Sequence, residues 1–193
     1  MKATTARTIG ATAIAVALVS VESAVADTQF DVCGLGDAVI AQSLQPMLDG
    51  YWEVDMGPGV LSMQGRTMPL PPGEPDVASI TSDDASMIIS GGVVFESFPL
   101  HWETGAEWSF DLSDDSVLDP DDILDDDEQS ILAGCPVEDL PRLFSQGEYV
   151  DPESGQPVSF ELYLRVISPS VIYGMVIGRS GGGTAQRAVS LTR

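Results

Sequence analysis

Apolar and polar residues alternate strictly from Val158 to Val166, and this pattern constrains the fold of the chain more than any other feature of its sequence. In a strand, the apolar members of such a run face one side and the polar members the other. One buried face and one solvated face are typical of an antiparallel sheet. Similar segments follow, separated by Ser168-Pro169-Ser170 and by the glycine-rich stretch 179–183, both of which have turn chemistry.

Further strand candidates fill most of the chain, and only two segments have helical spacing, 36–48 and 119–133. The expected strands are 51–56, 60–68, 77–80, 87–90, 93–102, 107–112, 144–150, 158–168, 171–178 and 185–191. We expect Gly57-Pro58-Gly59 to be a turn. The sequence therefore predicts a mainly β protein, an antiparallel up-and-down barrel or sandwich of about 8–10 short strands with two short helices.

The second expected helix has recognisable ends. Asp119 resembles an N-cap, with Pro120 at the first helical position, and Gly134 suits the exit. An apolar stripe is expected on its buried face, formed by Ile123, Leu124, Ile131 and Leu132.

Residues 1–26 have the three-part layout of a secretory signal peptide. Lys2 and Arg7 provide a positive start, an apolar run covers 9–19, and Ala24-Val25-Ala26 is a small-x-small cleavage pattern. The apolar run is too short to span a bilayer. We expect a periplasmic or secreted protein, with one domain over 27–193 and no membrane span after removal of the signal.

Cys33 and Cys135 are the only cysteines, and both belong to the part of the chain expected to be exported. In an oxidising compartment an even pair is most simply one disulfide. A redox pair is the alternative, but catalytic thiols usually lie close together in sequence. The sequence predicts a structural disulfide.

The chain has 30 acidic and 8 basic residues and a formal net charge of −22. Nucleic acid is a poor partner for such a chain, because phosphate binding depends on clustered Lys and Arg. Two cysteines and one histidine exclude a cysteine-ligated zinc site, and we expect neither metal nor cofactor. The acids of 119–128 do not fit a calcium loop, since Ile123 and Leu124 fall at ligand and glycine positions. They predict a solvated acidic helix, with weak cation binding as the alternative.

No catalytic motif stands out. Gly178-Arg179-Ser180-Gly181-Gly182 has the letters of a nucleophile elbow, but a strand follows instead of a helix and His101 lies upstream. A hairpin turn is the better interpretation. His101 has no identifiable nucleophile near it by motif, and no carboxylate pair is marked out for glycoside hydrolysis. The sequence favours a protein that is not an enzyme, with a hydrolase as a third hypothesis.

Trp52 and Arg187 form a notable combination at the two ends of the predicted sheet. Trp52 falls on the apolar face of the first strand, and Arg187 is in phase with Val189 and Leu191 in the last. First and last strands are neighbours when a sheet closes into a barrel. An indole can stack on a buried guanidinium. A solvent-accessible edge arginine is the alternative for Arg187.

Gly50-Tyr51-Trp52, after a short helix and at the start of the first strand, resembles the G-x-W motif of the lipocalins and the wider calycin group. The resemblance implies an up-and-down barrel enclosing a small apolar ligand. It also implies a last-strand arginine over this tryptophan at the closed end, with Arg187 as first candidate and Arg193 as second. The expected helix at 119–133 interrupts the strands, which departs from the family pattern.

Two hypotheses of function lead. The first is non-enzymatic binding of a small hydrophobic ligand in a lipocalin-like barrel, with Trp52, Trp108, Phe110, Phe160 and Leu162 as inward residues. The second is an envelope interaction protein with a solid core and no ligand cavity, acting through a surface patch or an exposed strand.

Overall fold

The computed structural model describes residues 30–83, 86–92, 94–104, 108, 118, 123–152 and 154–193, with the backbone alone for Val94 and Phe95. The expected signal peptide at 1–26 therefore lies outside the described residues. So do Phe110, Asp119 and most of the strand expected at 107–112.

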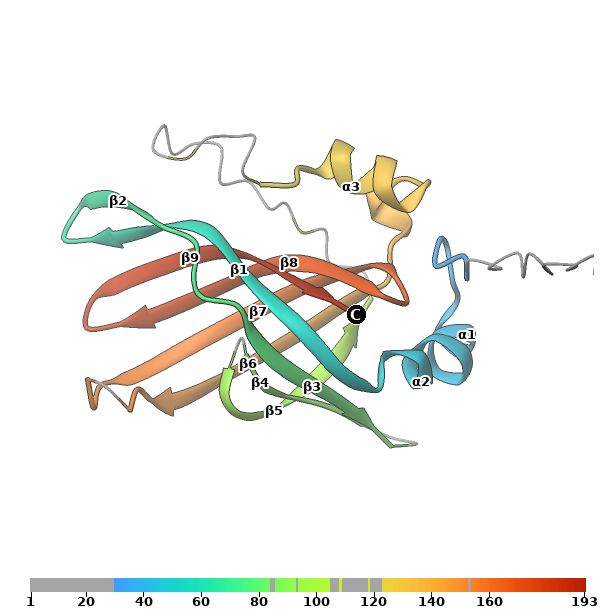
Figure 1. Ribbon diagram of the computed structural model, residues 1–193, viewed down its shortest axis with the longest axis horizontal. Coiled ribbons are helices and arrows are strands. Elements are labelled where there is room, and N and C mark those ends of the chain that lie inside the picture. The colour runs from blue at the N-terminus through green and yellow to red at the C-terminus, as the bar shows by residue number, and fades with distance from the viewer. Residues whose placement is uncertain are drawn as a thin grey trace, which may run out of the picture.

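The described chain is a closed antiparallel β-barrel, as the sequence predicted (Figure 1). Its strands are β1 (Gly50–Met63), β2 (Arg66–Leu70), β3 (Asp76–Ser82), β4 (Met87–Gly91), β5 (Val94–Glu103), β6 (Arg142–Val150), β7 (Pro157–Ser168), β8 (Val171–Ser180) and β9 (Gly183–Thr192). From β3 to β9, each strand pairs with the next one in the sequence. The barrel closes through β1, which pairs with β3 on one side and with β9 on the other. Eight strands thus form the barrel, and β2 is an additional strand on β1.

The first strand is longer than the sequence predicted. Gly57-Pro58-Gly59, expected to be a turn, lies inside β1 as a bulge between Met56 and Gly59. Pro58 is tolerated there because the ladder is interrupted at the bulge. A Cβ on Gly59 would lie 2.2 Å from the Gln186 carbonyl oxygen, so glycine is required for this close approach. The hairpin turn falls instead at Gln64-Gly65, where both residues have positive φ.

A helical segment covers one end of the barrel, close to the expected span of 36–48 (Figure 1). It consists of α1 (Asp37–Val39), a π-helical stretch η1 (Ile40–Leu44) and α2 (Gln45–Leu48). Pro46 has no N–H to donate, which explains why the wider turn directly precedes it. Leu44 and Leu48 are fully buried in the barrel core. We call this the closed end.

The second helix is shorter than expected. α3 (Asp126–Ala133) begins after Asp125, which caps it in a reciprocal capping box with Glu128. Gly134 ends it in the left-handed conformation, as predicted. The expected stripe is wrong at Ile131 and Leu132, which are 79% and 56% exposed.

The polar Gln129 takes the buried place on α3, because its amide donates to the Leu124 carbonyl and accepts from Arg165. A single 3₁₀ turn, η3 (Val137–Asp139), then leads into β6.

The predicted disulfide is confirmed. Cys33, just before α1, is bonded to Cys135, just after α3, so the bridge joins two segments outside the barrel wall. No free cysteine is present in the described part of the chain.

Candidate functional site

The inward side chains of the barrel form rows that cross neighbouring strands at the same height. Nearest the closed end, Val166 pairs with Ile172, Ile172 with Leu191, and Leu191 with Val54. The next row contains Leu143, Leu164 and Val189. All of these side chains are apolar and almost completely buried in the main core. The half of the barrel next to the helices is therefore filled by its own side chains.

The third row differs because it introduces polar groups into the interior. Ser145 on β6 pairs with Leu162, Leu162 with Val176, and Val176 with Arg187 on β9. We call these four residues the polar row. It separates the filled closed half from the rows beyond it, which we call the open half.

Arg187 lies on the inner face of β9, opposite Gly59 of β1. Its Nη1 is so close to Gly73 that a Cβ on that glycine would lie 2.9 Å from it. Burial lowers the pKa of the Arg187 guanidinium. Among the described residues, no hydrogen bond or ion pair to this guanidinium is present. Arg187 is thus a partly desolvated cation without a counter-ion from the described chain.

Ser145 is the second unusual polar group of this row. The residue is 0% exposed, and its hydroxyl has no hydrogen-bond partner in the described structure. Buried hydroxyl groups are almost always hydrogen-bonded, because an unpaired one loses its bonds to water without replacement. Ser145 therefore presents an unused donor and acceptor to the interior.

Aromatic rings surround the start of the open half. The rings of Phe98 and Phe160 meet edge to face with centroids 4.6 Å apart, and Tyr149 lies 6.2 Å from Phe160. Gly147 is required beneath them, because a Cβ there would lie 2.3 Å from the Phe98 ring. The β5–β6 ladder contains only the three pairs from His101 to Glu103, so Phe98 covers a section of wall that lacks a ladder.

The open half begins with small residues at three of the four positions of its first row. Its first row contains Gly147, Phe160, Gly178 and Ala185. A Cβ added to Gly178 would meet a single atom within 4 Å, Cγ1 of Val158 at 4.0 Å, so there is free space at this position. At the rim, a surface pocket of about 470 Å³ is lined by the ends of β7, β8 and β9.

The closed end carries the tryptophan–arginine pair, with a different arginine from the first candidate. Trp52 is fully buried, and its Nε1 donates to the Leu48 carbonyl at 2.9 Å. Arg193 lies over the indole, 4.4 Å from its centroid, and donates to the carbonyls of Met47, Asp49 and Pro169. The second candidate of the sequence thus occupies the position first assigned to Arg187. Arg187 lies three rows away, because β9 continues past it for five residues, to Thr192.

Trp108 lies on the outer face of the barrel, which corrects the expectation that it points inward. Its ring contacts Tyr163, with centroids 5.1 Å apart, and belongs to an outer cluster with Val60 and Met175. Arg142 lies over the same ring. The aromatic character of Trp108 did not indicate its side of the sheet, because an apolar cluster also covers part of the outer face.

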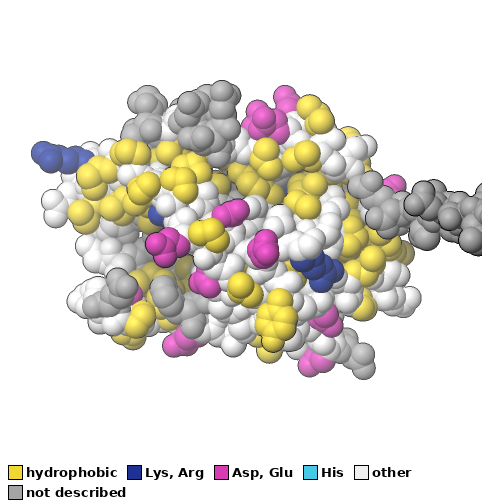
Figure 2. Space-filling view, in the orientation of Figure 1, with side chains coloured by type: hydrophobic (Ala, Val, Ile, Leu, Met, Phe, Trp, Pro, Cys, Tyr) yellow, Lys and Arg dark blue, Asp and Glu magenta, His cyan; other side chains and the backbone are white. Residues whose placement is uncertain are grey.

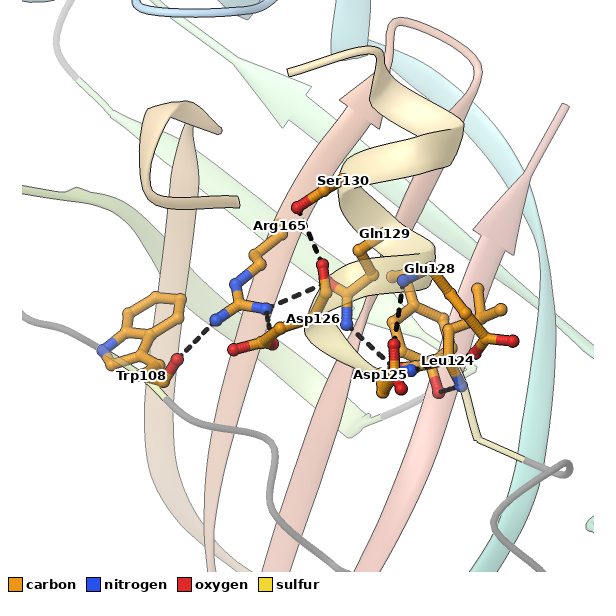
Figure 3. Close-up of polar contacts among 9 residues, drawn as sticks. Trp108, Leu124, Asp125, Asp126, Glu128, Gln129, Ser130 and Arg165 are labelled. Atoms are coloured by element: carbon orange, nitrogen blue, oxygen red, sulfur yellow. Dashed lines mark hydrogen bonds and ion pairs between the residues drawn. The ribbon is translucent and has the colours of Figure 1, made fainter. Parts of the chain in front are cut away.

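Buried Arg165 attaches Trp108 and α3, which we call the outer layer, to β7 (Figure 3). Its guanidinium donates to Asp126 at 2.5 Å, to Gln129 at 3.1 Å and to the Trp108 carbonyl. The acidic segment therefore supplies a structural ion pair through Asp126. No group of three or more potential metal ligands occurs among the described residues; Asp119, Asp121 and Asp122 lie outside them.

Of the inward residues predicted, Trp52, Phe160 and Leu162 lie on the inner face and belong to the main core. Their role in ligand binding stays a prediction. Sequence reasoning missed Phe98, Gly147 and Ser145. The alternation Leu143, Ser145, Gly147 along β6 was the available signal for the last two.

The remaining motifs have structural places. Gly181-Gly182 is the β8–β9 hairpin turn, with positive φ at both residues, as expected. His101 is exposed on β5. The site therefore offers apolar and aromatic walls with one cation and one hydroxyl, a set suited to holding a molecule.

No protein-family model, no curated protein and no solved structure matches the chain. The fold is compatible with a lipocalin-like barrel at the level of its eight-stranded antiparallel architecture. None of the described helices has the length and apolar character needed to cross a membrane.

Proposed function

We propose that the protein binds a small hydrophobic molecule in the open half of its barrel and carries out no chemistry on it. The observation that carries this proposal is the contrast along the barrel axis. The closed half is filled by buried aliphatic side chains, whereas the open half has aromatic rings, small residues and free space at Gly178. Ligand sites are typically apolar and concave, with a few polar groups that orient the ligand.

A lumen-filling variant tests the proposal. A Cβ at Gly178 would meet only Cγ1 of Val158, at 4.0 Å, so Gly178→Leu can begin its side chain without a clash and we expect the fold to tolerate it. Gln186→Leu is the matched control. Gln186 pairs with Ile177 of β8, and both side chains face away from the barrel interior. We expect Gly178→Leu to abolish binding of a fluorescent apolar dye and Gln186→Leu to leave it unchanged. Equal binding by both variants would place the dye elsewhere and overturn the proposal.

Native mass spectrometry supplies an independent test. Protein purified from its own host should carry a lipid-sized adduct, and this adduct should be absent from Gly178→Leu protein purified in the same way.

The proposed location is the periplasm or the exterior of the cell. The signal-like layout of 1–26 and the Cys33–Cys135 disulfide support it, since disulfides persist in oxidising compartments. The mass of the protein from its host should correspond to a chain that starts near Asp27. A chain that retains Met1 would contradict export through cleavage.

An interaction module is the second candidate, and exposed apolar side chains favour it. Ile131 and Leu132 protrude from α3, and Met63 and Met68 are exposed on the β1–β2 hairpin. Figure 2 shows hydrophobic side chains gathered on the β1–β2 hairpin and beside α3. A partner protein captured by the wild type and lost in the double variant Ile131→Ser/Leu132→Ser would support this function instead.

A further inference from the structure

We infer that the ligand is an anionic amphiphile whose carboxylate is bound by Arg187 and Ser145, with its apolar tail directed towards the open rim. This inference rests on the proposed function, because it names the class of molecule that the same site would hold.

The first argument is the missing counter-ion. The chain has 30 acidic residues for 8 basic ones, so carboxylates are abundant. Arg165 is paired with Asp126 and Arg179 with Glu161. Arg187, by contrast, lies in the interior with no carboxylate partner among the described residues. A guanidinium remains charged at any physiological pH, so an anion is needed to offset its desolvation.

The second argument is the placement of Ser145 in the same row. Ser145 and Arg187 are three strands apart in a barrel of eight, so their inward side chains come from facing parts of the wall. A carboxylate has two oxygens and accepts hydrogen bonds from several donors at once. The unused hydroxyl of Ser145 can donate to one oxygen, and the guanidinium can donate to the other.

The third argument gives the orientation. Below the polar row the interior is filled, so a head group bound there cannot extend a tail towards the helices. Above it lie the rings of Phe98, Phe160 and Tyr149. From Arg187 to the start of β9 at Gly183 the strand is about 13 Å long. At the usual tilt of barrel strands this corresponds to a depth of about 10 Å for a tail. The head group would thus lie deep in the barrel and the tail nearer the rim.

Two probes with the same tail separate charge from apolar binding. We would measure decanoate and decanol by isothermal titration calorimetry with the full processed protein. The wild type should bind decanoate about 10- to 100-fold more tightly than decanol, because hydrogen bonds to charged groups strengthen binding by that factor. A net charge of −22 repels anions in general, so a preference for decanoate would have to arise from a specific site.

Variants locate the preference. Arg187→Met should reduce decanoate binding to the level of decanol and leave decanol unchanged, Arg187→Lys should restore part of the loss, and Ser145→Ala should cause a smaller loss. Arg179→Met, which removes an outer arginine near the same rim, should change neither. Circular dichroism of each variant checks that the barrel remains folded.

The outcomes distinguish the two proposals. Equal affinity of the wild type for decanoate and decanol overturns the carboxylate site and leaves apolar binding in place. Loss of the preference in Arg179→Met but not in Arg187→Met also overturns it. Failure of both alkyl probes and of the apolar dye overturns the proposed function together with this inference.

Discussion

The two arginines of the C-terminal segment, one at the closed end and one at the polar row, differ in what surrounds them. Arg193 lies over Trp52 and donates to three main-chain carbonyls. Arg187 lies six residues earlier, inside the barrel, and has no such partners among the described residues. The first guanidinium stabilises the junction between the last strand and the capping helices. The second contributes nothing comparable to the fold, which is why a role towards a ligand suits it.

The two ends of the barrel also differ in packing, with large buried side chains at the closed end and small residues in the open half. The closed end contains Trp52, Leu44 and Leu48, all fully buried, while the open half has glycine at positions 147 and 178. Stability should therefore be concentrated near the helices, and changes near the rim should affect binding more than unfolding.

The largest loss of stability should follow removal of the disulfide near the closed end. In Cys33→Ser/Cys135→Ser, the constraint on a loop of sequence separation 102 disappears. The chain-entropy model gives a loss of about 4–5 kcal/mol in the free energy of unfolding. Urea denaturation of the double variant and of the reduced wild type should give similar values. A loss below about 1 kcal/mol would show that the disulfide is not the main clamp at this end.

Arg193→Met should destabilise the protein by about 1–2 kcal/mol, measured by the same urea denaturation. The variant loses the cation over Trp52 and the donors to the carbonyls of Met47, Asp49 and Pro169. A hydrogen bond from a charged donor contributes more to stability when it is buried, but Arg193 is exposed to solvent, which reduces the contribution of its bonds and of its contact with the indole. Arg66→Met is the control, because Arg66 is exposed on β2. Equal stability of the two variants would contradict the structural role of Arg193.

Alkaline pH should weaken the packing of the outer layer at Tyr173. Burial raises the pKa of the Tyr173 phenol, whose oxygen accepts a hydrogen bond from the Leu124 N–H. In the unfolded chain this group ionises near pH 10, so above that pH ionisation favours the unfolded state. The contribution of Tyr173 to the free energy of unfolding should be constant below about pH 9 and fall as the pH rises through 10 to 11. The fall should be smaller in Tyr173→Phe, and an identical fall in both proteins would assign it to other groups.

The barrel could be predicted from the sequence because its main signal is local. The alternation along β7 and the Gly-rich turn at 181–182 each depend on neighbouring residues, and both agree with the structure. The disulfide followed from counting two cysteines. The bulge at Gly57-Pro58 was misread as a turn, because the nearby β9 backbone that makes it possible is distant in sequence.

The site was harder to predict because it depends on register across several strands. Trp108 has a large aromatic side chain, which is typical of a core residue, yet its contacts with Arg165 and Arg142 hold it on the outer face. Ser145 and Arg187 lie in the same row only because the registers of three ladders coincide, and no local sequence pattern predicts that alignment. Arg187 was the first candidate for the arginine over Trp52 and Arg193 the second, because nothing in the sequence gives the height of each residue in the barrel.

The smallest effect on stability, and the sharpest test of the comparison between the two arginines, should come from Arg187→Met. Methionine keeps much of the apolar stem of the arginine side chain, and it removes a cation whose desolvation no described group offsets. We expect the free energy of unfolding to stay within about 0.5 kcal/mol of the wild type or to rise, measured in the absence of ligand. In saturating decanoate the wild type should gain stability and Arg187→Met should gain much less, because a ligand stabilises the state that binds it. A loss as large as that of Arg193→Met without ligand would show that Arg187 belongs to the fold, and that the two ends of the barrel use their arginines in the same way.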